Sequence, residues 1–193
     1  MEISAKQLPS LYLITPEPTS LLDTTFFYLL EKCLDTGISL VQLRAKKLTK
    51  YDYCCCAEKA VKLCERYTAQ LLVNTTPVTA IMVGAHGVHL NSKRLLAYSK
   101  RPLSTQYWVA ASCHQSTEIQ QANLINTDSI VLGSVHTTAS HPEGNILGWS
   151  KFQKLAQQAK CPVFALGGMT LKDVPKAQIN GAQGIAAIRS LWK

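Results

Sequence analysis

Short runs of apolar residues recur along the chain, and a polar or amphipathic stretch follows nearly every one of them. Within a run the apolar residues are continuous, which is typical of parallel strands that are buried on both faces. This pattern predicts eight strands, at residues 11–14, 39–43, 71–73, 87–90, 107–112, 129–132, 162–166 and 184–188.

The stretches between these runs predict helices at 21–36, 49–67, 116–123, 149–159 and 170–179. A further helix has Pro77 in its first turn and ends at Gly84, and a short polar helix or loop follows 87–90. Thr49 and Thr170 are good N-cap residues, and Gly37 is a natural C-cap. Eight strand–helix units in succession indicate an α/β fold of the closed (β/α)8 (TIM) barrel type, short and without large insertions. A doubly wound open sheet is the alternative. We expect a single domain over residues 1–193.

The composition is that of an ordinary globular protein, with 47% hydrophobic and 17% charged residues. No stretch approaches the ~18 apolar residues of a membrane span. The N-terminal residues also lack the pattern of a secretory signal, so we expect a cytoplasmic protein that does not contact membranes. The seven cysteines include the consecutive Cys54, Cys55 and Cys56 but no CxxC pair. We therefore interpret them as buried thiols in a reducing compartment and predict no metal site.

The net charge of +8 points to an anionic partner, which is either nucleic acid or a small phosphorylated molecule. A nucleic-acid surface interleaves aromatic residues with a basic stripe. Here the basic residues form small groups, such as Lys46–Lys47 and Lys93–Arg94, and the aromatic residues lie elsewhere. The pattern favours a phosphorylated small molecule over nucleic acid.

In a barrel of this kind, the active site lies where the strands run into the loops that follow them. After the second strand, Gln42, Arg44 and Lys46 alternate and would share one face, where two cations suit a diphosphate. After the seventh strand, Gly167 and Gly168 precede a helix and predict a phosphate site.

Charged and titratable residues in the later loops extend this set of candidates. Arg189 follows the eighth strand and would add a charged contact to the phosphate. His136 and His141 lie in the long loop after the sixth strand and are candidates for a general acid or base. Each of these residues also has a plain interpretation as a surface or loop residue, and we interpret His86 as structural.

Eight segments together resemble the thiamine phosphate synthase and thiazole tautomerase family, over essentially the whole chain. They are residues 11–15, 41–46, 73–74, 84–90, 111–114, 133–138, 165–170 and 181–186. Their order and spacing make the resemblance specific, and the family fold is a (β/α)8 barrel. In the synthase, a pyrimidine diphosphate ionises to a carbocation and pyrophosphate, and the nitrogen of a thiazole phosphate captures the carbocation.

The resemblance implies three groups of binding residues. The residues that would bind the pyrimidine diphosphate are Gln42, Arg44, Lys46 and Asn74. Ser112 is assigned to pyrophosphate. The thiazole or its phosphate is assigned to Thr138, Ser140, Gly168, Ile188 and Arg189.

This chain departs from the synthase pattern at the residues that hold Mg2+ in the family. The two magnesium aspartates are replaced by Thr75 and, approximately, Arg94. His141 stands where the synthase has a lysine, and Arg189 where it has a serine. In the tautomerase pattern, a catalytic histidine occupies the place of Ser134, two residues from His136. Because Mg2+ needs oxygen ligands, Thr75 and Arg94 argue against the Mg2+ that the family uses, and we predict no protein-held metal.

Segments 140–142, 165–169 and 188–192 look most like the divergent synthase-like domains that are often fused to Nudix hydrolases, and no Nudix segment is present in this sequence. Our first hypothesis is a synthase-like protein of thiamine biosynthesis with weakened activity. A thiazole tautomerase is a less favoured version of the same hypothesis. The alternative is a non-catalytic binder of a phosphorylated ligand that regulates thiamine metabolism. Family members often associate, so a homo-oligomer is also an expectation of the resemblance.

Overall fold

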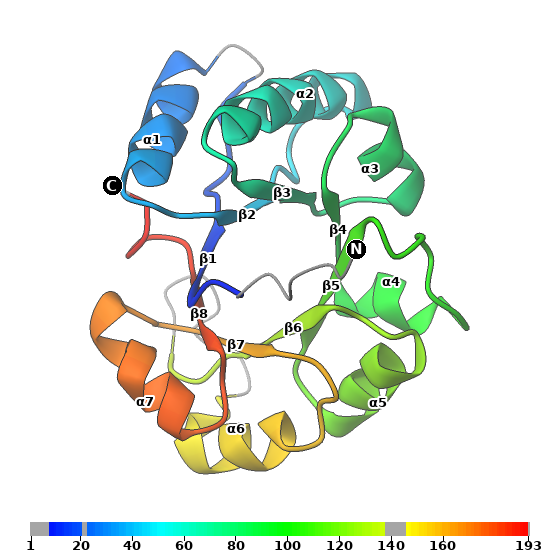
Figure 1. Ribbon diagram of the computed structural model, residues 1–193, viewed down its shortest axis with the longest axis vertical. Helices are drawn as coiled ribbons and strands as arrows, with labels where there is room; N and C mark the ends of the chain where they lie inside the picture. The colour runs from blue at the N-terminus through cyan, green and yellow to red at the C-terminus, as the bar shows by residue number, and fades with distance from the viewer. Residues whose placement is uncertain (1–7, 21–22, 138–145, 193) are drawn as a thin grey trace, which may run out of the picture.

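Eight parallel strands close into a barrel in a computed structural model that describes residues 8–20, 23–137 and 146–192. The strands follow one another around the barrel in chain order (Figure 1). They are β1 (Leu11–Ile14), β2 (Leu40–Leu43), β3 (Gln70–Val73), β4 (Gly87–Leu90), β5 (Trp108–Cys113), β6 (Ser129–Gly133), β7 (Val163–Leu166) and β8 (Gly184–Ala187). Because β8 also pairs with β1, with Leu11 opposite Ile185, the barrel prediction is confirmed and the open sheet is excluded.

Helices form a ring around the outside of the barrel (Figure 1). They are α1 (Thr24–Asp35), α2 (Lys50–Arg66), α3 (Pro77–Met82), α4 (Ser92–Leu96), α5 (Ser116–Leu124), α6 (Gly148–Ala156), the 3-10 turn η1 (Leu171–Asp173) and α7 (Val174–Ile179). No helix in the described part of the chain is long and apolar enough to cross a membrane.

The apolar residues of each strand serve two separate cores. One core fills the space between the strands and the helices, and it includes Leu13, Val41 and Leu43. The other fills the barrel interior, where Tyr12 and Leu40 alternate with those residues along β1 and β2. This double burial explains the continuous apolar runs in the sequence.

Local sequence signals place most helix boundaries. Thr49 caps α2 by accepting the backbone N–H of Asp52, and Pro77 lies in the first turn of α3, both as predicted. The first helix was predicted from residue 21, but α1 begins at Thr24. The reason is Asp23, whose side chain accepts the N–H of Phe26 and so fixes the helix start.

Thr170 caps the helical segment over 171–179, as predicted, but the segment does not begin as an α-helix. Residues Leu171–Asp173 form the 3-10 turn η1, and the α-helix α7 begins only at Val174, with proline in its first turn. Proline is tolerated in the first turn of a helix and not in the interior, so Pro175 favours this later start.

The seven cysteines differ in burial. Cys33, Cys56, Cys64 and Cys113 are buried, whereas Cys54, Cys55 and Cys161 are partly exposed. The prediction that all seven thiols are buried is therefore wrong. It fails for Cys54 and Cys55 because consecutive residues of α2 point in different directions around the helix.

Candidate active site at the barrel mouth

A hydrogen-bonded row of side chains crosses the interior of the barrel close to its carboxyl-end mouth. The hydroxyl of Tyr12 on β1 lies 3.0 Å from Nδ1 of His89 on β4. The Nε2 atom of His89 lies 2.8 Å from Oγ of Ser112 on β5. Burial lowers the pKa of His89 to about 3 and raises the pKa of Tyr12, so both groups are neutral near pH 7.

The row continues through two amides toward the ends of β2 and β3. Gln42 is 2% exposed and hydrogen-bonds the phenol of Tyr12. Nδ2 of Asn74 donates to Oε1 of Gln42 at 3.3 Å. Asn74, Gln42 and Ser112, all predicted as binding residues, are thus joined by Tyr12 and His89.

Arg44 lies beside a carboxylate that the sequence analysis did not include among the site residues. Nη1 of Arg44 is 3.6 Å from Oε2 of Glu17, and the other carboxylate oxygen of Glu17 accepts the backbone N–H of Lys47 at 2.6 Å. Because β2 already ends at Leu43, strand alternation does not extend to Arg44 and Lys46. Gln42 is enclosed in the barrel, whereas Lys46 is exposed at its mouth, so these two residues lie at different depths.

A cavity of about 800 Å³ opens among the loops that follow β2, β3 and β4. It brings together four residues that the resemblance had singled out, namely Lys46, Asn74, Thr75 and Arg94. Lys50 is a third cation in its wall. The cavity thus brings together Thr75 and Arg94, at or near the two positions where the resemblance implies aspartates.

The chemistry of this cavity suits an anion and does not fit a protein-held Mg2+. The residues that line it include three cations and no carboxylate. No group of three or more histidine, cysteine, aspartate or glutamate residues that could hold a metal ion occurs in the described ranges. Mg2+ is held mainly through carboxylates and substrate oxygens, and neither the uncharged Thr75 hydroxyl nor the cationic Arg94 supplies the negative charge of an aspartate ligand.

The loops after β6 and β7 lie against each other on the other side of the mouth. The N–H of Val135 donates to the carbonyl of Leu166 at 2.7 Å, and the N–H of His136 donates to the carbonyl of Gly167 at 3.2 Å. Gly167 has a φ of +108°, and a Cβ there would lie 2.7 Å from the Cβ of Ser134. Only glycine permits both this conformation and this close approach.

His136 is exposed and lies at the predicted phosphate turn. Its ring packs edge-on against Trp149, with centroids 5.7 Å apart, and its Cβ would lie 3.2 Å from a Cβ added at Gly168. The structure therefore places this candidate acid or base next to Gly167 and Gly168. Thr138, Ser140 and His141 lie outside the described residues.

The turn after β8 is attached to the turn after β7. Oγ of Ser190 donates to the carbonyl of Met169 at 2.6 Å. Ile188 packs on the interior core, and Arg189 between them is exposed. These two turns, which hold the predicted phosphate residues, are neighbours at the mouth.

The helix N-terminus predicted to bind this phosphate already carries a carboxylate of its own. Oδ2 of Asp173 accepts the N–H and the hydroxyl of Thr170, at 2.9 and 2.8 Å. Because α7 starts only at Val174, two groups of candidate hydrogen-bond donors to the phosphate remain. They are the glycine turn and the turn at Ile188 and Arg189.

Two other histidines have structural contacts. Nδ1 of His86 accepts the N–H of Leu71 at 3.1 Å, in agreement with its structural interpretation. Nδ1 of His114 donates to the carbonyl of Gly133 at 2.7 Å and so ties the end of β5 to the end of β6.

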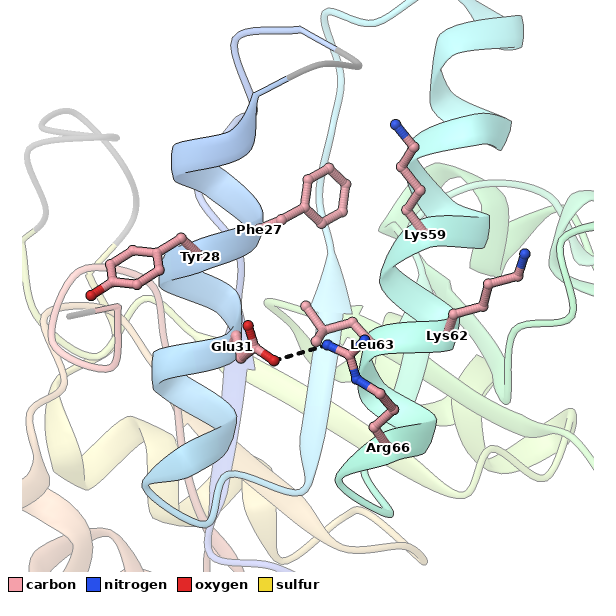
Figure 2. Close-up of a pocket in the computed structure, with 7 residues that line it drawn as sticks. All are labelled: Phe27, Tyr28, Glu31, Lys59, Lys62, Leu63 and Arg66. Atoms are coloured by element: carbon pink, nitrogen blue, oxygen red, sulfur yellow. Dashed lines mark hydrogen bonds and ion pairs between the residues drawn. The ribbon is translucent and has the colours of Figure 1, made fainter.

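A second hollow, of about 390 Å³, lies outside the barrel between α1 and α2 (Figure 2). Arg66 and Glu31 form an ion pair across it at 2.8 Å. Its walls come from the helical ring and include none of the predicted site residues.

The fold defines the chain as a (β/α)8 barrel protein with a cationic mouth. The family model described as thiamine monophosphate synthase matches residues 11–191, and the chain belongs to this family. It is similar to a putative thiamine-phosphate synthase 2 of Aquifex aeolicus, with 32% identity over 94% of this chain and 97% of that protein. It is also similar to a putative thiamine-phosphate synthase of Geobacter sulfurreducens, with 31% identity over 94% of this chain and 86% of that protein.

A solved structure supports the fold independently. The thiamine phosphate pyrophosphorylase from Pyrococcus furiosus superposes with a TM-score of 0.74 over 93% of this chain and 85% of that chain, at 22% identity. The family and the fold that the sequence predicted are both confirmed.

Proposed function

We propose that this protein binds a pyrimidine diphosphate and a thiazole phosphate at the barrel mouth and joins them to form thiamine phosphate. The cavity of about 800 Å³ with Lys46, Asn74 and Arg94 in its wall carries this proposal. It lies next to the buried Gln42, and family membership supplies the substrate class.

In the proposed reaction, the C–O bond between the pyrimidine methylene and the diphosphate breaks and pyrophosphate departs with both electrons. The thiazole nitrogen then donates its lone pair to the carbocation and forms the new C–N bond. The departing charge needs stabilisation, which positioned cations supply without reorganising during the reaction. Lys46 and Arg94 would perform this role in place of metal-bound charge.

The test is thiamine phosphate formation from the two substrates, with Mg2+ or with EDTA. Product in EDTA supports the proposal. Product that forms only with Mg2+ would overturn the proposal that Lys46 and Arg94 replace the metal-bound charge. The metal would then be held by groups other than Thr75 and Arg94. If the folded protein forms no product in either condition, the synthase function is excluded.

A matched pair of variants tests the role of Arg94. Arg94→Ala is expected to weaken binding of the pyrimidine diphosphate roughly tenfold or more, since charge-assisted contacts are worth about 1.5–3 kcal/mol. Lys93→Ala removes the same charge from the neighbouring exposed position of α4, which is not part of the cavity wall, and should leave binding nearly unchanged. Equal effects of the two substitutions would argue against a specific contact.

A non-catalytic ligand binder is the second candidate, and the absence of a carboxylate from the cavity wall favours it. For this candidate, calorimetry would detect the pyrimidine diphosphate or thiamine phosphate binding without turnover. A tautomerase with His136 as proton carrier is a weaker possibility, which His136→Ala tests directly: intact tautomerisation of the thiazole phosphate in that variant would exclude the role.

A further inference from the structure

The buried row from Asn74 to Ser112 has a single direction of hydrogen bonding, and this direction sets the role of Ser112. Nδ2 of Asn74 donates to Oε1 of Gln42. The hydrogen bond of the Gln42 side chain to Tyr12 lowers the pKa of the phenol, which is the effect of a donor to the phenol oxygen. Tyr12 has one proton, and its nearest remaining partner is Nδ1 of His89 at 3.0 Å. Tyr12 therefore donates to Nδ1.

This donation fixes the tautomer of His89. Because the neutral ring accepts at Nδ1, its proton is on Nε2, 2.8 Å from Oγ of Ser112. Oγ of Ser112 then accepts from His89, and its own hydroxyl proton makes no hydrogen bond within the described residues.

The burial along the row agrees with a ligand at its end. Tyr12, Gln42 and His89 are between 0 and 2% exposed, whereas Asn74 and Ser112 at the two ends are partly exposed. The row is thus enclosed in the middle and reaches the mouth at both ends. Low dielectric surroundings strengthen such hydrogen bonds and make an unpaired group inside costly.

We propose that Tyr12 and His89 are positioning residues, which hold the Ser112 hydroxyl as a hydrogen-bond donor to an anionic oxygen of the ligand at the mouth. The identity of that anion as a diphosphate or pyrophosphate rests on the proposed function. The direction of the row does not, since it follows from the hydrogen bonds within the row.

Nitrogen-15 NMR of the histidine side chains tests the direction without any ligand. The expected result is that His89 is the neutral Nε2–H tautomer at pH 7. An Nδ1–H tautomer would overturn the proposal, because Ser112 would then donate into the row instead of toward the mouth. A doubly protonated ring would overturn it as well.

A double-mutant cycle with inorganic pyrophosphate as the probe tests the consequence for binding. Ser112→Ala is expected to weaken binding roughly tenfold, and Tyr12→Phe by a smaller factor. The double variant should bind like Ser112→Ala, since Tyr12 acts only through that hydroxyl. Additive losses would show that the Tyr12 hydroxyl acts on binding by a route other than Ser112, and would overturn the positioning role, because the phenylalanine ring keeps the packing on Phe164.

The control is Tyr67→Phe, which removes a phenol that donates to Glu31 on the outer helical ring and should not change pyrophosphate binding. If the wild-type protein fails to bind pyrophosphate while His89 shows the Nε2–H tautomer, the proposed function fails and the direction of the row stands. Pyrophosphate binding together with an Nδ1–H tautomer of His89 would support the proposed function and overturn the direction of the row.

Discussion

His89 has both ring nitrogens engaged inside the barrel, with Nδ1 3.0 Å from the Tyr12 hydroxyl and Nε2 2.8 Å from the Ser112 hydroxyl. The ring is 1% exposed. A charged imidazolium would have to be desolvated there, and it would lose Nδ1 as an acceptor for Tyr12. The free energy of unfolding should therefore depend on pH through the protonation of His89.

The first prediction concerns this link. The pKa of His89 is about 3 in the folded protein, against ~6.5 in an unfolded chain. Between these values the unfolded state binds more protons, so the free energy of unfolding rises with pH. Stability from this group is complete above pH ~6.5 and is lost as pH falls toward 3, by at most about 1.4 kcal/mol per pH unit.

Urea unfolding between pH 7 and 5 measures this effect above the range in which most carboxylates titrate. His89→Gln should be less stable at pH 7 and should show a flatter dependence on pH across this interval. Equal pH slopes for His89→Gln and the wild-type protein would contradict the assignment.

The second prediction concerns the glycine turn after β7. Gly167→Ala would place a Cβ 2.7 Å from the Cβ of Ser134 and 2.8 Å from the backbone nitrogen of Val135, at a φ of +108°. Gly37→Ala meets no atom within 4 Å, although its φ is +90°. The Gly37 variant should lose about 1–2 kcal/mol from the left-handed backbone alone. Gly167→Ala should lose clearly more, because the β6 loop must also move.

Thermal unfolding of the two variants compares these costs. If Gly167→Ala were no less stable than Gly37→Ala, the close packing of the two loops would not exist in solution.

The barrel was predictable because its signal is local and repeated. Each run of apolar residues reports a strand that is buried on two faces, and residues such as Thr49 and Pro77 mark helix starts by their own chemistry. The start of α1 was missed because the helical pattern extends back to residue 21, while the Asp23 cap decides where the helix begins.

The candidate site was only partly predictable. Lys46, Asn74 and Arg94 meet because the carboxyl ends of neighbouring parallel strands form one mouth. Tyr12 looks like an ordinary residue of an apolar strand, and its contact with His89 exists only once β1 and β4 face each other across the closed barrel. Residue types and spacing contain no signal for a contact across the barrel interior.

The third prediction concerns the thiols. Burial raises the pKa of Cys56 to about 11 and that of Cys64 to about 12, and it raises the pKa of Cys113 as well. A thiol reagent at pH 8 should react first with Cys54 and Cys55, more slowly with Cys161, whose pKa burial also raises, and with the buried four only after unfolding. Mass spectrometry of the labelled peptides identifies the sites. Reaction of all seven at one rate in the native protein would contradict the burial pattern.

The fourth prediction concerns the carboxylate at the mouth. Glu17 forms an ion pair with Arg44 at 3.6 Å and also accepts the N–H of Lys47, so it neutralises a cation and anchors the loop after β2. Glu17→Gln keeps an oxygen for the Lys47 N–H but removes the negative charge. Since the pair is partly exposed, with side-chain exposures of 28% and 20%, the Coulomb effect is moderate.

Calorimetry should show pyrophosphate binding roughly two- to fivefold tighter in this variant, with the gain reduced at high salt. Glu58→Gln removes the same charge from an exposed position on α2 outside the cavity wall and serves as the control. Weaker binding in Glu17→Gln would show instead that the carboxylate holds Arg44 in its binding position, because losing that orientation would then outweigh the gain in positive charge.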